Sequence, residues 1–284
     1  MGQMKKADPK LSLDHLCKLF GVSPSTWYYQ QSAALKSDPE EEKIVRLMQD
    51  IHQQSYGSYG RRRMKKALNN QGVEIGHYKV SRLMADHGIV ATCPKKPHYY
   101  QGNKAHPTTL NVLERNFTVG QLNTRWVGDI TYIRHHQGWS YLAAVMDLGN
   151  REVVGYALSQ TPDAQLAKDA LADAIRKQQP DTRKLLFHSD QGVQYSAELF
   201  SGFLAVNQIE SSMSRRGNCW DNAVQERFFR SLKTERLNGL SFVNHQSVVE
   251  VVEQYIRFYN YTRLNSVIDY MTPVQKRREF SKAA

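Results

Sequence analysis

The second half of the chain alternates strand-like and helix-like segments, and this order restricts the possible folds more than any other feature. Three segments rich in aromatic and β-branched residues come first: RWVGDITYI, WSYLAAVMDL and REVVGYALS. A helical segment with its apolar residues on one side follows, and then strand, helix, strand and helix up to residue 235. This order predicts an α/β domain with a mixed sheet, within residues 118–284.

The first 35 residues predict a helix-turn-helix. Leu13, Leu16 and Leu19 fall on one face of a helix that stops at Gly21. A serine N-cap followed by a proline at the first helical position, Ser23–Pro24, starts a second helix at once. Two helices joined by a three-residue turn that contains glycine have the helix-turn-helix pattern.

Residues 38–90 predict a second unit of this kind. Two basic helices, beginning at RRRMKKAL and HYKVSRLM, follow an amphipathic helix after DPEEE. In the last helix we expect three residues to face a core (Val80, Leu83 and Met84) and two to point outward (Lys79 and Arg82). Such a surface suits a recognition helix in the DNA major groove with basic neighbours on phosphate. The alternative is a small helical bundle with a solvated basic face.

Positive charge is concentrated in the N-terminal part. The chain has 38 Lys and Arg against 27 Asp and Glu, a net charge of +11. Residues 1–116 hold 18 basic and 10 acidic residues, whereas residues 117–284 hold 20 and 17. A basic part joined to a nearly balanced part indicates a module that binds a polyanion. Between the two parts, residues 91–117 contain three prolines and little periodicity, which predicts a linker.

Several classes of protein are disfavoured. No apolar run approaches the ~18 residues that a membrane span needs, and the first residues lack the apolar core of a signal peptide. The three cysteines are widely spaced, which argues against a disulfide framework or a cysteine-rich zinc site. We therefore expect a cytoplasmic protein with no membrane partner.

Three acidic residues stand out by their places in the predicted elements. Asp129 lies within the first strand among apolar residues, Asp190 ends the fourth strand, and Glu226 lies one to two turns into the helix that follows the last strand. Alone, each has an ordinary explanation: a hydrogen-bonded strand acid, a turn residue, and an ion-pair partner of Arg230. Together, three carboxylates would repel one another unless cations lie between them. Carboxylates are the oxygen ligands that Mg²⁺ and Mn²⁺ prefer, so the set predicts a metal pair for phosphoryl transfer.

These stretches resemble the OrfB transposases of the bacterial insertion-sequence family of the IS-three type, which have a retroviral-integrase-like DDE core. The matching segments are WVGDITYI, FHSDQGVQYSAELF, SMSRRGNCWDNAVQERFFRSLKTE and YIRFYNYTRLNSVIDYMTPVQK, together with YGSYGRRRMKKAL and GHYKVSRLM. The 35 residues between Asp190 and Glu226 match the spacing of this catalytic class. The resemblance implies an RNase H-like catalytic core and an N-terminal all-α helix-turn-helix region.

The resemblance also implies an activity and partners. Asp129, Asp190 and Glu226 would bind two Mg²⁺ ions, with Mn²⁺ as a substitute, and Asp129 would bridge both. The enzyme would cleave DNA at the insertion-sequence ends and transfer the freed 3′-hydroxyl into DNA, with no covalent protein–DNA intermediate. Its partners would be double-stranded DNA (terminal inverted repeats and target), further copies of itself, and an upstream OrfA portion as fusion or partner. It would act in the bacterial cytoplasm, on the nucleoid. The alternatives are a DNA-binding regulator with an inactive core and a simple RNase H-like nuclease.

Other residues receive secondary roles. For His188 two roles are open: it orients a catalytic water or touches phosphate, or it only packs. We expect Asn222 and Asp221 to cap the helix of Glu226, and Glu235 to be solvated. Asp147 is expected in a turn, with the acid cluster as its alternative, and His135 and His136 on the surface. The residues predicted to contact DNA are Arg61, Arg62, Arg63, Lys65, Lys66, Lys79, Arg82, Arg215, Arg216 and Lys233.

Overall fold

The computed structural model describes residue 8 and residues 11–35, 38–92, 110–117, 120–214 and 222–283. Within these ranges, none of the helices is both long and apolar enough to span a membrane. Arg215, Arg216 and Asp221, to which the sequence assigned roles, lie outside the described residues.

The two N-terminal helices agree with the helix-turn-helix pattern. Helix α2 (Leu13–Phe20) ends at Gly21, whose φ of 62° lies in the left-handed region that glycine tolerates best. Helix α3 (Pro24–Leu35) follows after three residues. The side chain of Ser23 accepts a hydrogen bond from the backbone N–H of Thr26 at 3.1 Å, as expected for an N-cap.

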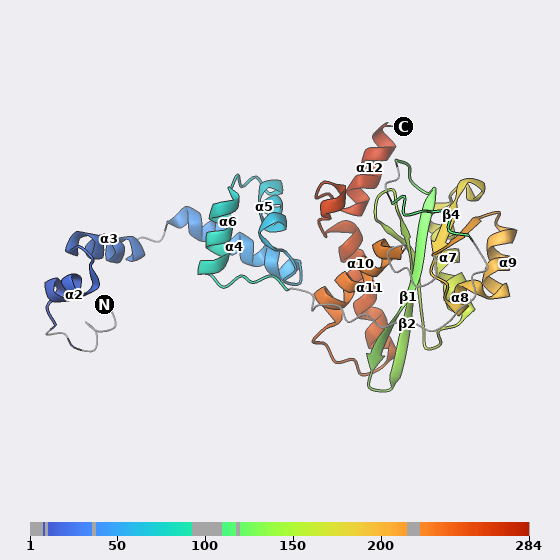
Figure 1. Cartoon of the computed structure of the whole chain (residues 1–284), viewed down its shortest axis with the longest axis horizontal. Coiled ribbons are helices and arrows are strands. Elements are labelled where there is room, and N and C mark those ends of the chain that lie inside the picture. The colour runs from blue at the N-terminus through green and yellow to red at the C-terminus, as the bar shows by residue number, and fades with distance from the viewer. Residues whose placement is uncertain are drawn as a thin grey trace.

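Three further helices, α4 (Pro39–Gln54), α5 (Arg61–Asn70) and α6 (His77–Asp86), surround a small core of their own. The predicted inner face of α6 is confirmed, because Val80, Leu83 and Met84 are buried. They pack with buried residues of α4 and α5, among them Met48 and Met64. In Figure 1, α4, α5 and α6 lie next to one another, between α2–α3 and the sheet. We refer to α4–α6 as the helical unit.

The sheet is mixed, as predicted. Its strands are β1 (Arg125–His135), β2 (Gly138–Asp147), β3 (Val153–Ser159), β4 (Leu186–Ser189) and β5 (Glu210–Met213). They lie in the order β3-β2-β1-β4-β5, in which β1, β2 and β3 are antiparallel neighbours whereas β4 runs parallel to β1 and β5 parallel to β4. The long first strand therefore lies at the centre, next to the end of β4.

Helices cover both faces of the sheet (Figure 1). One face packs against α10 (Ala223–Leu232), its continuation as a π-helical turn η3 (Lys233–Leu237), and α11 (His245–Tyr261). The other packs against α7 (Ala164–Gln178), α8 (Val193–Ser196) and α9 (Glu198–Val206). The remaining elements are η1 (Thr182–Lys184), η4 (Ser266–Ile268) and α12 (Pro273–Ala283).

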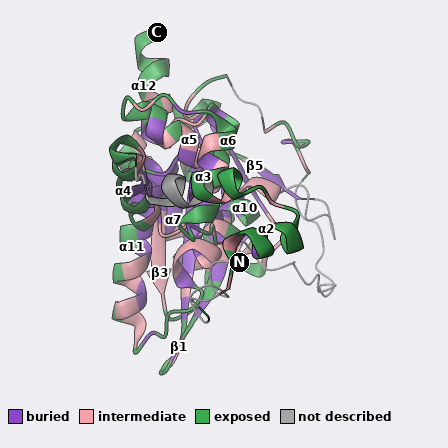
Figure 2. Cartoon of the chain, turned by 90° about the vertical axis from the view of Figure 1, so that its left-hand side faces the viewer, coloured by how far each residue is buried: buried purple, intermediate pink, exposed green. Residues whose placement is uncertain are grey.

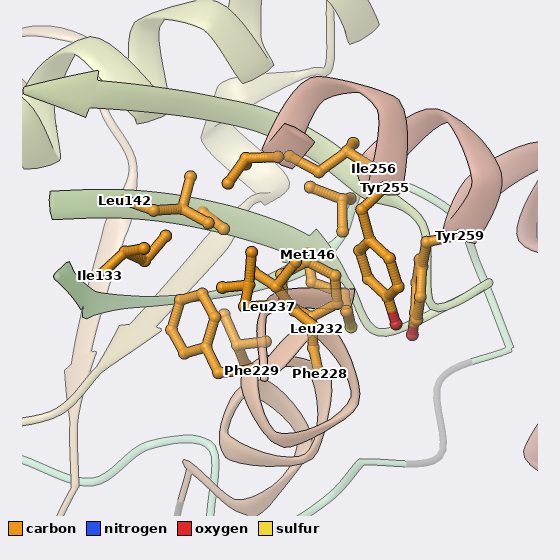
Figure 3. Packing of buried hydrophobic residues seen from close by; sticks show 14 of the residues in the cluster. Ile133, Leu142, Met146, Phe228, Phe229, Leu232, Leu237, Tyr255, Ile256 and Tyr259 are labelled. Carbon is orange, nitrogen blue, oxygen red and sulfur yellow. The ribbon is translucent and has the colours of Figure 1, made fainter. Parts of the chain in front are cut away.

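Alternation along β2 explains why both faces are apolar. Leu142 and Met146 point to the side of α10 and α11, where Figure 3 shows them beside Phe228, Phe229 and Tyr255. Ala143 and Val145, one residue out of step, join the core under α7 and α9. In Figure 2, buried residues are correspondingly concentrated inside the sheet and helix layers.

The helical unit also contacts the α/β half of the chain, residues 120–283, directly, which the sequence did not predict. The hydroxyl of Tyr59 accepts a hydrogen bond from the backbone N–H of Leu264 at 2.8 Å and donates one to the oxygen of Thr262 at 3.3 Å. Leu264 is buried in the core of the helical unit, and Tyr56 packs edge-on against Phe258 of α11. The helical unit and the α/β half are therefore in contact through buried side chains.

Candidate active site

Asp129 lies in the middle of β1, on the sheet face that α10 covers. Side chains alternate along a strand, so Asp129 shares its face with Val127 and Ile133, which both pack in the core next to α10 and α11. Its carboxylate accepts a hydrogen bond from the backbone N–H of Ile130 at 2.8 Å.

Asp190 follows the last residue of β4 directly. Because β4 runs parallel to β1, with His188 opposite Val127, the end of β4 comes next to the part of β1 that carries Asp129. The carboxylate of Asp190 accepts a hydrogen bond from the N–H of Gly192 at 3.1 Å, which fixes the turn after the strand. This place agrees with the tendency of ligand sites in open α/β sheets to gather at strand ends.

Glu226 lies in the first turn of α10, slightly earlier in the helix than the sequence indicated, and its side chain is exposed. Two amides fasten this end of α10 to the sheet. Asn222 donates a hydrogen bond to the oxygen of Gly128 at 3.2 Å, and Gln225 donates one to the oxygen of Ala144 at 3.1 Å. The first acceptor belongs to the residue before Asp129, and Ala144 lies opposite Asp129 on β2.

Asn222 occupies the N-cap position of α10, as predicted, but its side chain does not cap the helix. Its side chain makes no capping hydrogen bond to α10, since the amide is directed to Gly128 instead. The contact ties the helix to the strand rather than satisfying the first N–H groups of the helix.

The three carboxylates act on one another. Burial raises the pKa of Asp129 well above its usual range, and the negative charges of Asp190 and Glu226 raise it further. Burial also raises the pKa of Asp190, against the hydrogen bond from Gly192. Partial desolvation of the carboxyl raises the pKa of Glu226, although the side chain is exposed overall; the charge of Arg230 opposes the shift and that of Asp190 adds to it. The structure thus brings together the three acids that the sequence singled out.

Two further side chains lie in the field of these acids. Burial lowers the pKa of Lys233, and the charge of Asp129 opposes that shift. Burial raises the pKa of Tyr195 well above its usual range, with Asp129 and Asp190 adding to the effect. Sequence reasoning included Lys233 but missed Tyr195, which lies five residues after Asp190 in the segment DQGVQY. It packs against Phe187 and Phe200 in the core under α7 and α9.

The donor chemistry of the three acids suits a hard divalent cation. All are carboxylates, the oxygen ligands that Mg²⁺ and Mn²⁺ prefer, and their mutual repulsion would be relieved by positive charge between them. Among the described residues, no three or more His, Cys, Asp or Glu side chains are close enough together to hold a metal ion. The three carboxylates come from separate elements and influence one another electrostatically.

His188 is held away from solvent. It is fully buried, its Nδ1 is 2.9 Å from the hydroxyl of Ser212, and its Nε2 is 3.2 Å from that of Ser214. Of the two roles that the sequence allowed, these contacts favour packing between β4 and β5.

The basic residues predicted to contact DNA fall into different settings. Arg61, Arg62 and Lys66 of α5 are exposed. Arg63 is directed inward, with Nη1 3.9 Å from Glu235. Both outward residues of α6, Lys79 and Arg82, form salt bridges with Glu41 of α4, so their charge is partly neutralised.

The structure also tests the expectations for Glu235, for His135 and His136, and for Asp147. Glu235 is not solvated: its side chain is 7% exposed and forms a two-point ion pair with Arg263, at 2.6 and 2.7 Å. His135 is buried rather than on the surface, although His136 is exposed. Asp147 has the turn role, because its carboxylate accepts hydrogen bonds from the N–H groups of Asn123 and Gly149 at 2.7 and 2.8 Å.

Family models match most of the chain. Residues 121–219 and 207–273 match two models described as "Integrase core domain", and residues 39–97 match one described as "HTH-like domain". These matches agree with the predicted fold class, an N-terminal helical region followed by an RNase H-like core with a five-stranded mixed sheet. More distantly, the magnesium complex of the HTLV-2 integrase catalytic core is similar at 16% identity and a TM-score of 0.43, over 54% of this chain and 95% of that one.

Curated relatives match over nearly their full length. The chain is 34% identical over 267 residues to the putative transposase InsK of insertion element IS150 from Escherichia coli K12, covering 94% of each chain. It is 32% identical over 279 residues to the transposase InsF of insertion sequence IS3A from the same organism, covering 96% of each. With the domain matches, these identities show that the chain belongs to the IS3 family of insertion-sequence transposases, as an OrfB-like member with an integrase core domain and an N-terminal helix-turn-helix-like domain.

Proposed function

We propose that this transposase cleaves DNA at the ends of an insertion sequence and transfers the freed 3′-hydroxyl into DNA, with Asp129, Asp190 and Glu226 as its catalytic carboxylates. The observation that carries the proposal is the convergence of these three acids. They come from the middle of β1, the end of β4 and the first turn of α10, and the pKa of Asp129 responds to the charges of both others. Burial and mutual repulsion both disfavour the charged carboxylates, and a bound cation would offset both effects.

The acids would hold two Mg²⁺ ions, for which Mn²⁺ could substitute. Asp129 would contribute to both ions, and Asp190 and Glu226 would each complete one. When bound, a metal pair lowers the barrier for in-line attack by an oxygen nucleophile and stabilises the oxygen that leaves.

Other residues of the chain would hold the DNA. Lys233 lies on the turn that continues α10, and the charge of Asp129 acts on it, so its ammonium could contact a phosphate next to the reacting one. The exposed Arg61, Arg62 and Lys66 of α5 would contact phosphates of the duplex, for which a basic helix is suited.

The DNA would be the double-stranded terminal repeats of the element and its target. Two ends must be brought together for transposition, so we include a dimer or higher oligomer on DNA, and an upstream OrfA portion as fusion or partner, in the proposal.

The experiment is a cleavage and joining assay on a plasmid that carries the terminal repeats of the element encoding this chain. We expect activity in Mg²⁺ and in Mn²⁺, and none in Ca²⁺, because Ca²⁺ is larger and takes a looser coordination. Joined products separate a transposase from a simple nuclease, and any metal-dependent cutting separates it from a regulator with an inactive core. Equal cleavage in the presence of a chelator would rule the proposal out.

A further inference from the structure

A basic cavity lies on the side of α10 that faces away from the acids. Its volume is about 290 Å³, and α10 contributes Val224, Arg227, Phe228 and Ser231 to its wall. These positions are three or four residues apart and share one helix face, whereas Glu226 lies on another. The phenyl ring of Phe228 packs edge-on against Tyr259 of α11, and Figure 3 shows the two side chains together.

Four arginines line this cavity, each from a different segment. Arg63 comes from α5, Arg151 from the turn between β2 and β3, Arg227 from α10, and Arg263 from the residues after α11. Burial lowers the pKa of Arg63, and the charge of Arg263 lowers it further. Glu235 offsets part of this charge, because it pairs with Arg263 at two points and lies 3.9 Å from Nη1 of Arg63. The arginines that Glu235 does not pair with are Arg151 and Arg227.

Arg151 is the most informative of the four. It is only 8% exposed, and its Nη2 donates a hydrogen bond to the backbone oxygen of Phe117 at 2.8 Å. Its Nη1 is buried and has no hydrogen-bond partner among the residues that the structure describes. A buried guanidinium nitrogen without an acceptor is costly, so an anion bound at Nη1 would stabilise this part of the structure.

A second cavity continues the first. It has a volume of about 340 Å³, shares Arg63 and Ser266 with the first cavity, and is otherwise lined by Gly60, Arg61, Arg62 and Tyr270. The two cavities adjoin, because Arg63 and Ser266 line both. We call the two together the arginine groove; its basic residues are Arg61, Arg62, Arg63, Arg151, Arg227 and Arg263.

We infer that the arginine groove binds the sugar–phosphate backbone of DNA. Guanidinium groups bind phosphate oxygens in paired hydrogen bonds, and the Nη1 of Arg151 lacks such an acceptor within the described part of the chain. A chain of phosphates, rather than one free phosphate, fits two connected cavities with arginines along both. The inference rests on the proposed function and adds to it a DNA-binding surface outside the acid site, which fixes the helical unit relative to α10.

The test measures how affinity for a 30-base-pair duplex depends on salt, in EDTA so that no cleavage occurs. Each phosphate contact contributes about 0.9 to the slope of log K against log salt, or about a 3.5-fold loss between 50 and 200 mM. We expect Arg151→Gln and Arg227→Gln each to lower the slope by about one contact. Arg183→Gln, an exposed arginine of η1 outside the groove, is the matched control and should leave the slope unchanged.

Arg151 is buried, so its variant is checked by circular dichroism and melting, and Arg227→Gln keeps the test valid if Arg151→Gln unfolds. Inorganic phosphate distinguishes the two sources of the anion. If millimolar phosphate raises the melting temperature of the wild type but not of Arg227→Gln, while the duplex slopes of both are equal, the groove is a free-anion site and the inference is wrong. Equal slopes without any phosphate effect also overturn it. Loss of joining activity in the plasmid assay, with slopes as expected, would contradict only the proposed function.

Discussion

The side-chain amide of Asn222 donates a hydrogen bond to the backbone oxygen of Gly128, 3.2 Å away. Gly128 precedes Asp129, and Asn222 precedes the helix that carries Glu226. Asn222 is buried, so water does not compete for this bond. Together with the hydrogen bond from Gln225 to Ala144, this bond holds the helix of Glu226 against the strand of Asp129.

Removing this amide should impair chemistry more than folding. In Asn222→Ala we expect the free energy of unfolding to fall by about 1 kcal/mol, as for one lost hydrogen bond. We expect the DNA-cleavage rate to fall by about ten-fold or more, because a misplacement of about 1 Å in an active site costs up to ~100-fold in rate. Urea denaturation and single-turnover cleavage measure the two effects.

The matched control is Asn207→Ala. Asn207 donates a hydrogen bond to the oxygen of Phe203 at 2.8 Å on α9, away from the acids. It should lose similar stability and keep its cleavage rate. Equal cleavage rates for the two variants would show that the contact between Asn222 and Gly128 has no part in the site.

Glu235→Gln should destabilise the protein. The carboxylate of Glu235 pairs with Arg263 at two points and accepts a hydrogen bond from the hydroxyl of Tyr255 at 2.8 Å. Removing its charge leaves the buried Arg263 uncompensated, so we expect a loss of about 3 kcal/mol in the free energy of unfolding. Chemical denaturation is the measurement, with the exposed Glu198→Gln as control, expected within about 0.5 kcal/mol of wild type. An unchanged midpoint for Glu235→Gln would contradict the buried ion pair.

Asp147 should make the protein less stable as pH rises. Burial raises the pKa of Asp147 from 3.8 to about 6, so between these values the folded state binds more protons than the unfolded state. Its contribution to the free energy of unfolding is present below pH 4 and is lost as pH rises through 6, by up to about 3 kcal/mol. Asp147→Asn cannot ionise, so its unfolding free energy should fall less than that of wild type between pH 4 and 7. Denaturation curves of both proteins at three pH values test this. If the unfolding free energies of wild type and Asp147→Asn change equally between pH 4 and 7, the raised pKa of Asp147 is contradicted.

The sequence predicted what depends on local pattern. Alternation and apolar faces gave the five strands and most helices, because both are properties of short segments. Asp129 stood out because it interrupts an apolar strand, and Asp190 because it ends one. The mixed sheet follows from the order of the elements.

What the sequence did not predict depends on contacts between distant residues. Glu235 looked like a solvated helix acid, and only the fold shows that Arg263, 28 positions later, makes it a buried partner. Likewise, asparagine is a favoured N-cap residue, but the side chain of Asn222 donates its hydrogen bond to the strand carbonyl of Gly128, 94 positions earlier. Lys79 and Arg82 seemed available to DNA because Glu41, on another helix, could not be placed beside them from pattern alone.

The most direct test of the catalytic proposal is strand joining by Glu226→Gln. The change keeps the size of the side chain and removes the negative charge that would hold a cation. Folding should be retained or slightly improved, because the desolvation of the charged carboxylate and its repulsion with Asp190 are removed, against the loss of its attraction to Arg230. DNA binding should persist. Cleavage and joining should both fall by orders of magnitude, as expected for a two-metal site that loses a ligand. Glu198→Gln, which also alters an exposed glutamate in the first turn of a helix, should join DNA at the wild-type rate. Near wild-type joining by Glu226→Gln would contradict the assignment of Asp129, Asp190 and Glu226 as the catalytic set.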